Sequence, residues 1–184
     1  VPVQPGNSGG PLVDEHGNEL PDGTEGELAV KTEPEWPVGL FPEYWRNPEA
    51  NAKAFHHGWY YTGDLVSRDK DGYFWFVGRA DDVIISASYR IGPFEVESAL
   101  LEHPAVAEAA VVGKPHPLRG AIVKAFVVLT EPNKPTDDLV KTLQDHVKNV
   151  TAPYKYPREV EFIADLPKTI SGKIRRNELR RREQ

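Results

Sequence analysis

The pattern of the sequence changes near residue 81, and this change predicts two structural units. Before it, short apolar runs alternate with turn residues, as in small antiparallel strands joined by tight turns. After it, segments with strand and helix periodicity follow one another, which is typical of a compact unit with a mixed core. We therefore expect an α+β protein, with a small antiparallel β subdomain over 1–80 and a compact α/β domain over 81–184.

In the first part, clusters of glycine, proline and asparagine mark the turns, at Pro5-Gly6, Gly9-Gly10-Pro11, His16-Gly17-Asn18 and Pro21-Asp22-Gly23. Strands are expected over 11–13, 26–31 and 73–77, the last after a hairpin turn at Asp71-Gly72. A short helix is expected from Pro48 to about Phe55, because Asn47 is a favourable N-cap and proline suits the first helical position.

In the second part, strands and helices alternate. Helices are expected over 93–102, from Thr136 onward and over 173–182, and strands over 83–85, 105–112, 121–129 and 159–163. Thr136 is a favourable N-cap, and the two aspartates that follow it suit the positive end of the helix dipole. Leu139, Leu143 and Val147 recur at helical spacing and are predicted to form the inner face of this helix.

The composition excludes several classes of function. The chain has no cysteine, which rules out a disulfide framework, a thiolate nucleophile and a metal site with cysteine ligands. No apolar run approaches the length that a bilayer requires, and no leader opens the chain, so we expect no membrane span and a cytoplasmic location. Methionine is absent even at position 1, and we therefore expect a piece of a longer polypeptide.

The charge is distributed unevenly. The formal net charge is −6, yet residues 168–184 carry seven bases and two acids. The acidic body argues against a general nucleic-acid binder. The basic end is suited to a phosphorylated small molecule or, alternatively, is a solvated helix, and we favour the second interpretation for Arg180-Arg181-Arg182.

The first candidate motif is Tyr61-Thr62-Gly63-Asp64-Leu65. A carboxylate presented at the end of a strand can accept hydrogen bonds from two vicinal hydroxyls, as a ribose offers. The alternative is an ordinary turn in which Asp64 caps its own backbone.

The second candidate motif runs from Gly78 to Pro93 and contains Arg79 and Arg90 on either side of an expected strand. Each guanidinium is suited to phosphate or sugar oxygens. The pair Asp81-Asp82 lies between two differently patterned regions, which makes it a candidate hinge. The alternative is an ion-pair cluster on the surface of a hairpin.

The third candidate motif is Pro167-Lys168-Thr169-Ile170-Ser171-Gly172-Lys173-Ile174-Arg175. Small hydroxyl residues before a Gly-Lys pair suggest an anion-binding loop with an ammonium group at its tip. It is not a P-loop, because the upstream glycine is missing and Ile174 occupies the Ser/Thr position. A solvated basic turn is the alternative.

Taken together, these motifs resemble those of the adenylate-forming acyl-CoA synthetase superfamily, and Gly26-Glu27-Leu28 agrees with this. The stretch from Tyr89 to Ser98, with Lys155-Tyr156-Pro157-Arg158, is most similar to the medium-chain and acetate-type enzymes. The resemblance implies that 1–80 ends a large N-terminal domain and that 81–184 is a mobile lid domain. It also implies that a carboxylic acid and ATP form acyl-AMP, which CoA converts to a thioester.

The resemblance implies roles for individual residues. Asp64 would hold the ribose hydroxyls, Arg79 and Arg90 would bind the nucleotide, and Asp81 would be the hinge. Lys173 would be the catalytic lysine of adenylation, acting through its charge. The expected CoA contacts are Ala87, Ser88, Tyr89, Arg119 and Tyr156. Magnesium is expected with ATP, but no metal ligand is identified in this chain.

Two further expectations follow from the resemblance. The superfamily usually has glycine where this chain has Ser88, so the path of the pantetheine arm is in doubt. The chain also lacks the superfamily's phosphate loop and acyl pocket, so alone it is expected to be inactive and to need its own N-terminal domain as a partner. Two alternatives stay open: an adenylating enzyme with a carrier-protein thiol or an amine as acceptor, and a module that only binds nucleotide or CoA.

Overall fold

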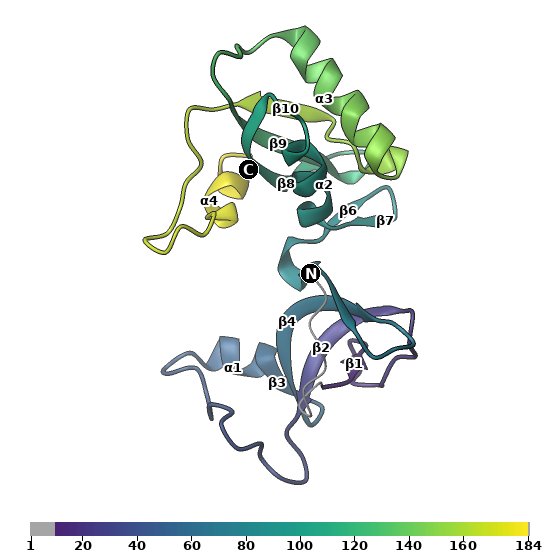
Figure 1. The fold of residues 1–184 in the computed structure, drawn as a ribbon. Helices are drawn as coiled ribbons and strands as arrows, with labels where there is room; N and C mark the ends of the chain where they lie inside the picture. The colour runs from purple at the N-terminus through teal and green to yellow at the C-terminus, as the bar shows by residue number, and fades with distance from the viewer. Residues whose placement is uncertain (1–9, 184) are drawn as a thin grey trace. The chain divides into compact units, whose positions relative to one another are not determined.

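The computed structural model describes residues 10–183, and the turn predicted at Pro5-Gly6 lies outside them. The chain divides into two compact units, the first ending at Asp81 and the second beginning at Asp82 (Figure 1). The described residues form two five-stranded sheets and four α-helices, so the predicted α+β class is confirmed.

The first unit is built on an antiparallel sheet. Its strands are β1 (Leu12–Val13), β2 (Glu25–Lys31), β3 (Phe55–His56), β4 (Trp59–Arg68) and β5 (Phe74–Arg79). The order is β1-β2-β4-β3, and β5 also pairs with β4. Because β4 contacts three other strands, it organises the unit, and its Trp59 and Tyr61 pack with Val13 and Ala29 in a small core.

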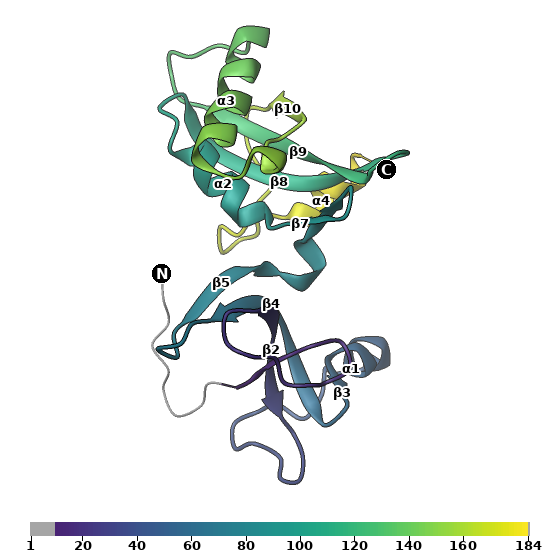
Figure 2. The same cartoon turned by 90° about the vertical axis from the view of Figure 1, so that its right-hand side faces the viewer.

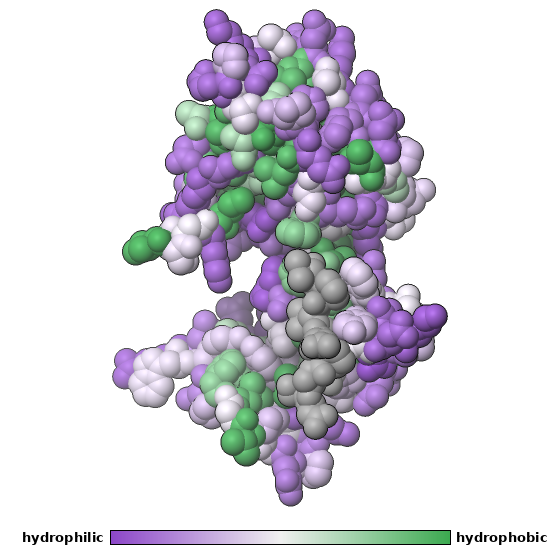
Figure 3. Space-filling view, viewed as in Figure 1, coloured by the Kyte–Doolittle hydropathy of each residue, from purple (hydrophilic) through white to green (hydrophobic). Residues whose placement is uncertain are grey.

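Helix α1 (Pro48–Ala54) is capped as predicted, since the Asn47 side chain accepts a hydrogen bond from the amide of Ala50 at 3.1 Å. The loop between β2 and α1 carries many aromatic residues. The ring of Phe41 lies 5.6 Å from that of Phe55 and 5.3 Å from that of Tyr60. Trp45 is nevertheless 79% exposed, and Figure 3 shows apolar surface on the face of the first unit where this loop lies.

The second unit has one sheet and three α-helices in its described part. After the short 3-10 turn η1 (Ala80–Asp82) come β6 (Ile84–Ser86), β7 (Tyr89–Ile91), α2 (Pro93–Leu101), β8 (Val106–His116), β9 (Gly120–Leu129), α3 (Asp137–Val150), η2 (Pro153–Lys155), β10 (Glu159–Phe162) and α4 (Arg176–Arg181). Strand β9 pairs along its length with antiparallel β8, and on its other side with parallel β10 and with β6, which continues to β7.

Alternate residues of the long strands point to opposite faces of this sheet. Helices α2 and α3 cover one face, where Val111 packs with Leu143 and Val147. Helix α4 and the segment before it cover the other, where Phe126 packs with Leu179 (Figure 2). The predicted inner face of α3 is confirmed, because Leu143 and Val147 are fully buried and Leu139 packs against the same cluster.

The structure corrects three details of the sequence prediction. The last helix begins at Arg176 and not at Lys173, because the preceding residues form a small hairpin with a bridge between Lys168 and Ile174. Strand β8 continues to His116 because β9 supplies partners along this extension. The short strand β7 was not predicted.

Among residues 10–183, no helix combines the length and the apolar composition that are needed to cross a membrane.

Candidate functional site

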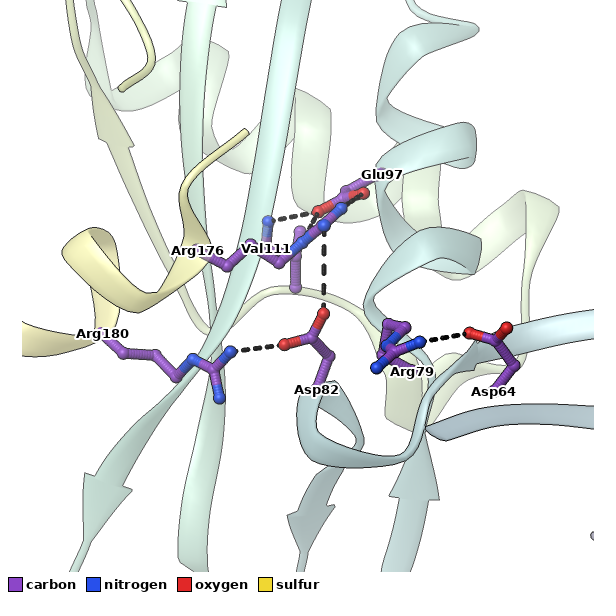
Figure 4. A network of polar contacts seen from close by, with 7 residues as sticks. All are labelled: Asp64, Arg79, Asp82, Glu97, Val111, Arg176 and Arg180. Carbon is purple, nitrogen blue, oxygen red and sulfur yellow. Dashed lines mark hydrogen bonds and ion pairs between the residues drawn. The ribbon is translucent and has the colours of Figure 1, made fainter. Parts of the chain in front are cut away.

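The hairpin of β4 and β5 brings together two of the predicted nucleotide residues. Asp64 and Arg79 are directly opposite each other in the register, and Arg79 Nη1 donates to Asp64 Oδ1 at 2.8 Å (Figure 4). The same Nη1 donates to the carbonyl of Thr62 at 3.1 Å. The Asp64 and Arg79 side chains remain 35% and 50% exposed. Asp64 therefore pairs across the hairpin, and its carboxylate is accessible to a ligand.

The backbone before Asp64 is held by contacts between β4 and the neighbouring strand β2. Thr62 Oγ1 donates to the carbonyl of Leu28 at 2.8 Å and accepts from the amide of Asp64 at 3.1 Å. The Glu27 carboxylate accepts from the amide of Gly63 at 2.9 Å. Burial raises the pKa of Glu27 above its usual value, and the hydrogen bond from Gly63 opposes this only in part. Sequence reasoning used Glu27 only as part of the resemblance and missed this contact.

Glycine is required at position 63 both by the backbone conformation and by the nearby side chain of Arg79. Gly23 has the same conformation without the close neighbour, so it serves as a control. Gly63 and Gly23 have φ of +78° and +81°, so alanine at either costs roughly 1–2 kcal/mol of backbone strain. A Cβ on Gly63 would lie 2.6 Å from Arg79 Nη2, whereas one on Gly23 would meet nothing within 4 Å. We expect Gly63→Ala and Gly23→Ala to lower the free energy of unfolding similarly, but only Gly63→Ala to separate Arg79 from Asp64.

Denaturant unfolding measures the first effect, and the NMR signal of the Arg79 guanidinium measures the second. An equal change of that signal in Gly23→Ala would contradict the assignment of the clash.

The hairpin of β6 and β7 places the predicted CoA residues 87–89 at its tip. Ala87 and Ser88 have φ of +48° and +73°, the left-handed conformations that a tight two-residue hairpin turn requires. This explains why glycine is favourable at position 88 and why serine there is strained. The amide of Ala87 donates to the carbonyl of Arg119 at 3.0 Å, so the hairpin tip and Arg119 lie side by side.

Aromatic rings lie beside this hairpin. The ring of Tyr89 stacks on that of Tyr154, with centroids 4.2 Å apart. Tyr156 lies instead beside Lys148, whose Nζ is 4.4 Å from the ring centroid, and beside Arg158, which donates to the Tyr156 hydroxyl at 3.0 Å. The third predicted nucleotide residue, Arg90, is exposed on β7.

Lys173 lies at the end of a tight turn before α4. Thr169 and Lys173 exchange contacts: the amide of Thr169 donates to the Lys173 carbonyl at 2.8 Å, and the amide of Lys173 donates to Thr169 Oγ1 at 3.1 Å. At the base of the turn, Lys168 Nζ binds Glu108 at 2.8 Å and Asp165 at 3.1 Å, and these hydrogen bonds raise the pKa of Lys168. The turn therefore presents Lys173 on an ordered and exposed loop.

An ion-pair network holds α4, and sequence reasoning missed it. Arg176 contacts Glu97 at two points, Nη2 to Oε2 at 2.5 Å and Nε to Oε1 at 3.1 Å, while Arg180 pairs with Asp82 (Figure 4). Burial raises the pKa of Glu97 even though Arg176 lowers it. The adjacent acids Asp81 and Asp82 were the feature of the sequence that could have indicated this network. Asp81 binds Lys53 Nζ at 2.7 Å in the first unit, and Asp82 binds Arg180 of α4 in the second.

Residues 10–183 contain no cluster of three or more histidine, aspartate or glutamate side chains that could hold a metal ion.

These observations define the second unit as a compact α+β domain with a lysine-bearing turn. Residues 95–173 match the model of the AMP-binding enzyme C-terminal domain. This part of the chain therefore resembles the C-terminal domain of AMP-binding, adenylate-forming enzymes.

Similarity to curated proteins extends over nearly the whole chain. This chain is 55% identical over 190 residues to the mitochondrial acyl-coenzyme A synthetase ACSM3 of Rattus norvegicus, and the match covers 98% of this chain and 33% of that protein. The chain thus spans about a third of the length of the curated relatives it matches.

Solved structures of similar sequence have a similar fold over this length. The anthranilate CoA ligase AuaEII in complex with anthranoyl-AMP superposes with a TM-score of 0.80 at 38% identity, over 95% of this chain and 33% of that one. The amide bond synthetase McbA of Marinactinospora thermotolerans superposes with a TM-score of 0.79 at 34% identity, over 95% and 34%.

Proposed function

We propose that the chain acts as the C-terminal part of an ATP-dependent acyl-CoA synthetase. In the first step a carboxylate oxygen attacks the α-phosphorus of ATP, and the bond to pyrophosphate breaks. In the second, the CoA sulfur attacks the acyl carbonyl, AMP leaves, and the thiol proton is released. The observation that carries the proposal is the similarity to named acyl-coenzyme A synthetases along almost the whole chain.

Asp64 and Arg79 are the proposed nucleotide residues of the first unit. The Asp64 carboxylate has a second oxygen besides the one that binds Arg79, so it can accept hydrogen bonds from ribose hydroxyls. Arg79 orients this carboxylate. In the second unit, Arg90 is proposed to bind phosphate, because an exposed guanidinium matches phosphate oxygens at two points.

Lys173 is the proposed catalytic residue of adenylation. Its ammonium group is a compact point charge, which suits it to the negative charge that develops on the α-phosphate and the attacking carboxylate. Asp81 is the proposed hinge, because it is the last residue of the first unit.

CoA is proposed to bind at the tip of the β6–β7 hairpin. Backbone groups of Ala87, Ser88 and Tyr89 would contact the pantetheine arm, and the adjacent Arg119 is suited to a phosphate of CoA. Tyr156 offers an aromatic ring for stacking. Magnesium is proposed to accompany ATP and to neutralise its phosphates.

The location in the cell stays a proposal. The composition favoured the cytoplasm, whereas the named relatives are mitochondrial proteins. Fractionation of cells that express the complete gene product distinguishes the two.

A second candidate function is adenylation with an acceptor other than CoA. The strained Ser88 at the hairpin tip and the likeness to an amide bond synthetase favour it.

The deciding experiment supplies the complete gene product with ATP, magnesium, CoA and acids from acetate upward. AMP and thioester are followed separately. We expect both products together, and we expect no AMP from the 184-residue chain alone. If adenylate forms without thioester, the second candidate is favoured, and Ser88→Gly then tests whether the serine blocks CoA. If no acid is adenylated, the proposed function is wrong.

A further inference from the structure

Helix α4 depends on tertiary contacts for its stability. It has six residues, and a helix of this length is unstable by itself in water. Its one buried residue is Leu179. Ion pairs near both of its ends add to this contact: Arg176 binds Glu97 and Arg180 binds Asp82, while Glu183, just after the helix, binds Lys124 at 2.6 Å. The place of α4 in the fold is therefore set largely by ion pairs, and Arg176 makes the one at its first residue.

Glu97 joins the two faces of the sheet around its open edge. It lies on α2, which covers one face, and it binds Arg176 of α4, which covers the other (Figure 4). Its Oε1 also accepts from the amide of Val111 at 2.8 Å. That amide belongs to β8, whose other edge pairs with β9. The Glu97 carboxylate thus accepts a hydrogen bond from an amide at the unpaired edge of β8 and also anchors helix α4 through Arg176.

Ion pairs anchor the lysine-bearing turn on both of its sides. On one side, Lys168 binds Glu108 of β8, with the two side chains 32% and 39% exposed. On the other, Arg176, three residues after Lys173, binds Glu97, whose side chain is 7% exposed. Exposed ion pairs contribute little, whereas removing one partner of a buried pair is strongly destabilising. The Glu97 anchor is therefore the stronger of the two.

We propose that Glu97 is a positioning residue for Lys173: by clamping Arg176 at the edge of β8, it determines where the lysine-bearing turn lies. Its significance for catalysis rests on the proposed function, whereas its effect on the turn does not.

The first arm of the test uses the 184-residue chain. Glu97→Gln keeps an acceptor for the Val111 amide but removes the charge that binds Arg176. The matched control is Glu178→Gln on α4 itself, which removes exposed pairs with Arg175 and Arg182. We expect amide hydrogen exchange over 173–181 to rise about 10- to 100-fold in Glu97→Gln, while β9 stays protected and the control changes little.

A second variant covers the case in which Glu97→Gln unfolds the domain. Arg176→Lys keeps the charge but loses the two-point contact, and a smaller local rise in exchange is expected over the same residues. If neither variant changes exchange over 173–181 more than the control does, the proposal is wrong.

The second arm measures half-reactions of the complete gene product. Glu97→Gln is expected to slow adenylation and to spare thioester formation from supplied acyl-adenylate. In a Lys173→Ala background it should cause no further loss, because a residue that acts through Lys173 has nothing left to position. An additive loss would overturn the proposal. If exchange changes as expected but the unaltered protein adenylates no acid, the proposed function fails and the anchoring of the turn stands.

Discussion

Replacing Lys173 by alanine in the complete gene product is expected to lower the rate of adenylation by roughly 10²- to 10³-fold, the usual cost of removing one group that stabilises transition-state charge. Lys173 lies on an exposed, hydrogen-bonded turn. Its removal therefore takes away a charge without disturbing the core. Thioester formation from supplied acyl-adenylate is expected to continue, since that step does not develop charge on the α-phosphate.

The two half-reactions are measured separately, by pyrophosphate release and by thioester formation. The matched control is Lys134→Ala, which removes another exposed lysine of the second unit and should leave both rates unchanged. Equal loss of both half-reactions in Lys173→Ala would contradict the role assigned to this residue.

The second large effect is expected in the core of the second unit. Phe126 is completely buried on β9, between Val112 of β8 and Leu179 of α4. Phe126→Ala would leave a cavity and lower the free energy of unfolding by about 3–5 kcal/mol. Because the chain divides at Asp81, we expect this loss in the second unit alone.

Hydrogen exchange measured by mass spectrometry separates the units. Exchange should rise steeply in peptides of β8 and β9 and stay unchanged in peptides of β4. The control Leu118→Ala removes a side chain that is 89% exposed and should change stability by less than about 0.5 kcal/mol. A similar rise in β4 would show that the units unfold together, against the expectation that residues 82–184 fold independently.

Local sequence signals predicted most elements well. Asn47 and Thr136 cap their helices as expected, because capping depends on a few neighbouring residues. The prediction that the last helix begins at Lys173 was wrong, and local contacts explain this too. The residues from Lys173 onward have acceptable helix propensity, but Thr169 and Gly172 close a hairpin turn at this point. Because so short a helix has little stability of its own, it does not displace the turn.

The candidate site likewise has features that were predictable from local sequence and features that were not. The residues proposed for the chemistry could be chosen from the sequence alone, since Asp64, Arg79, Arg90 and Lys173 stand in motifs that can be recognised without coordinates. Only the tertiary structure decided that Asp64 and Arg79 face each other across a hairpin and that Glu97 clamps Arg176 from 79 residues away. Motifs depend on local order along the chain, whereas these pairings depend on strand register and on which helices cover which face of a sheet, and neither is encoded near the residues that it brings together.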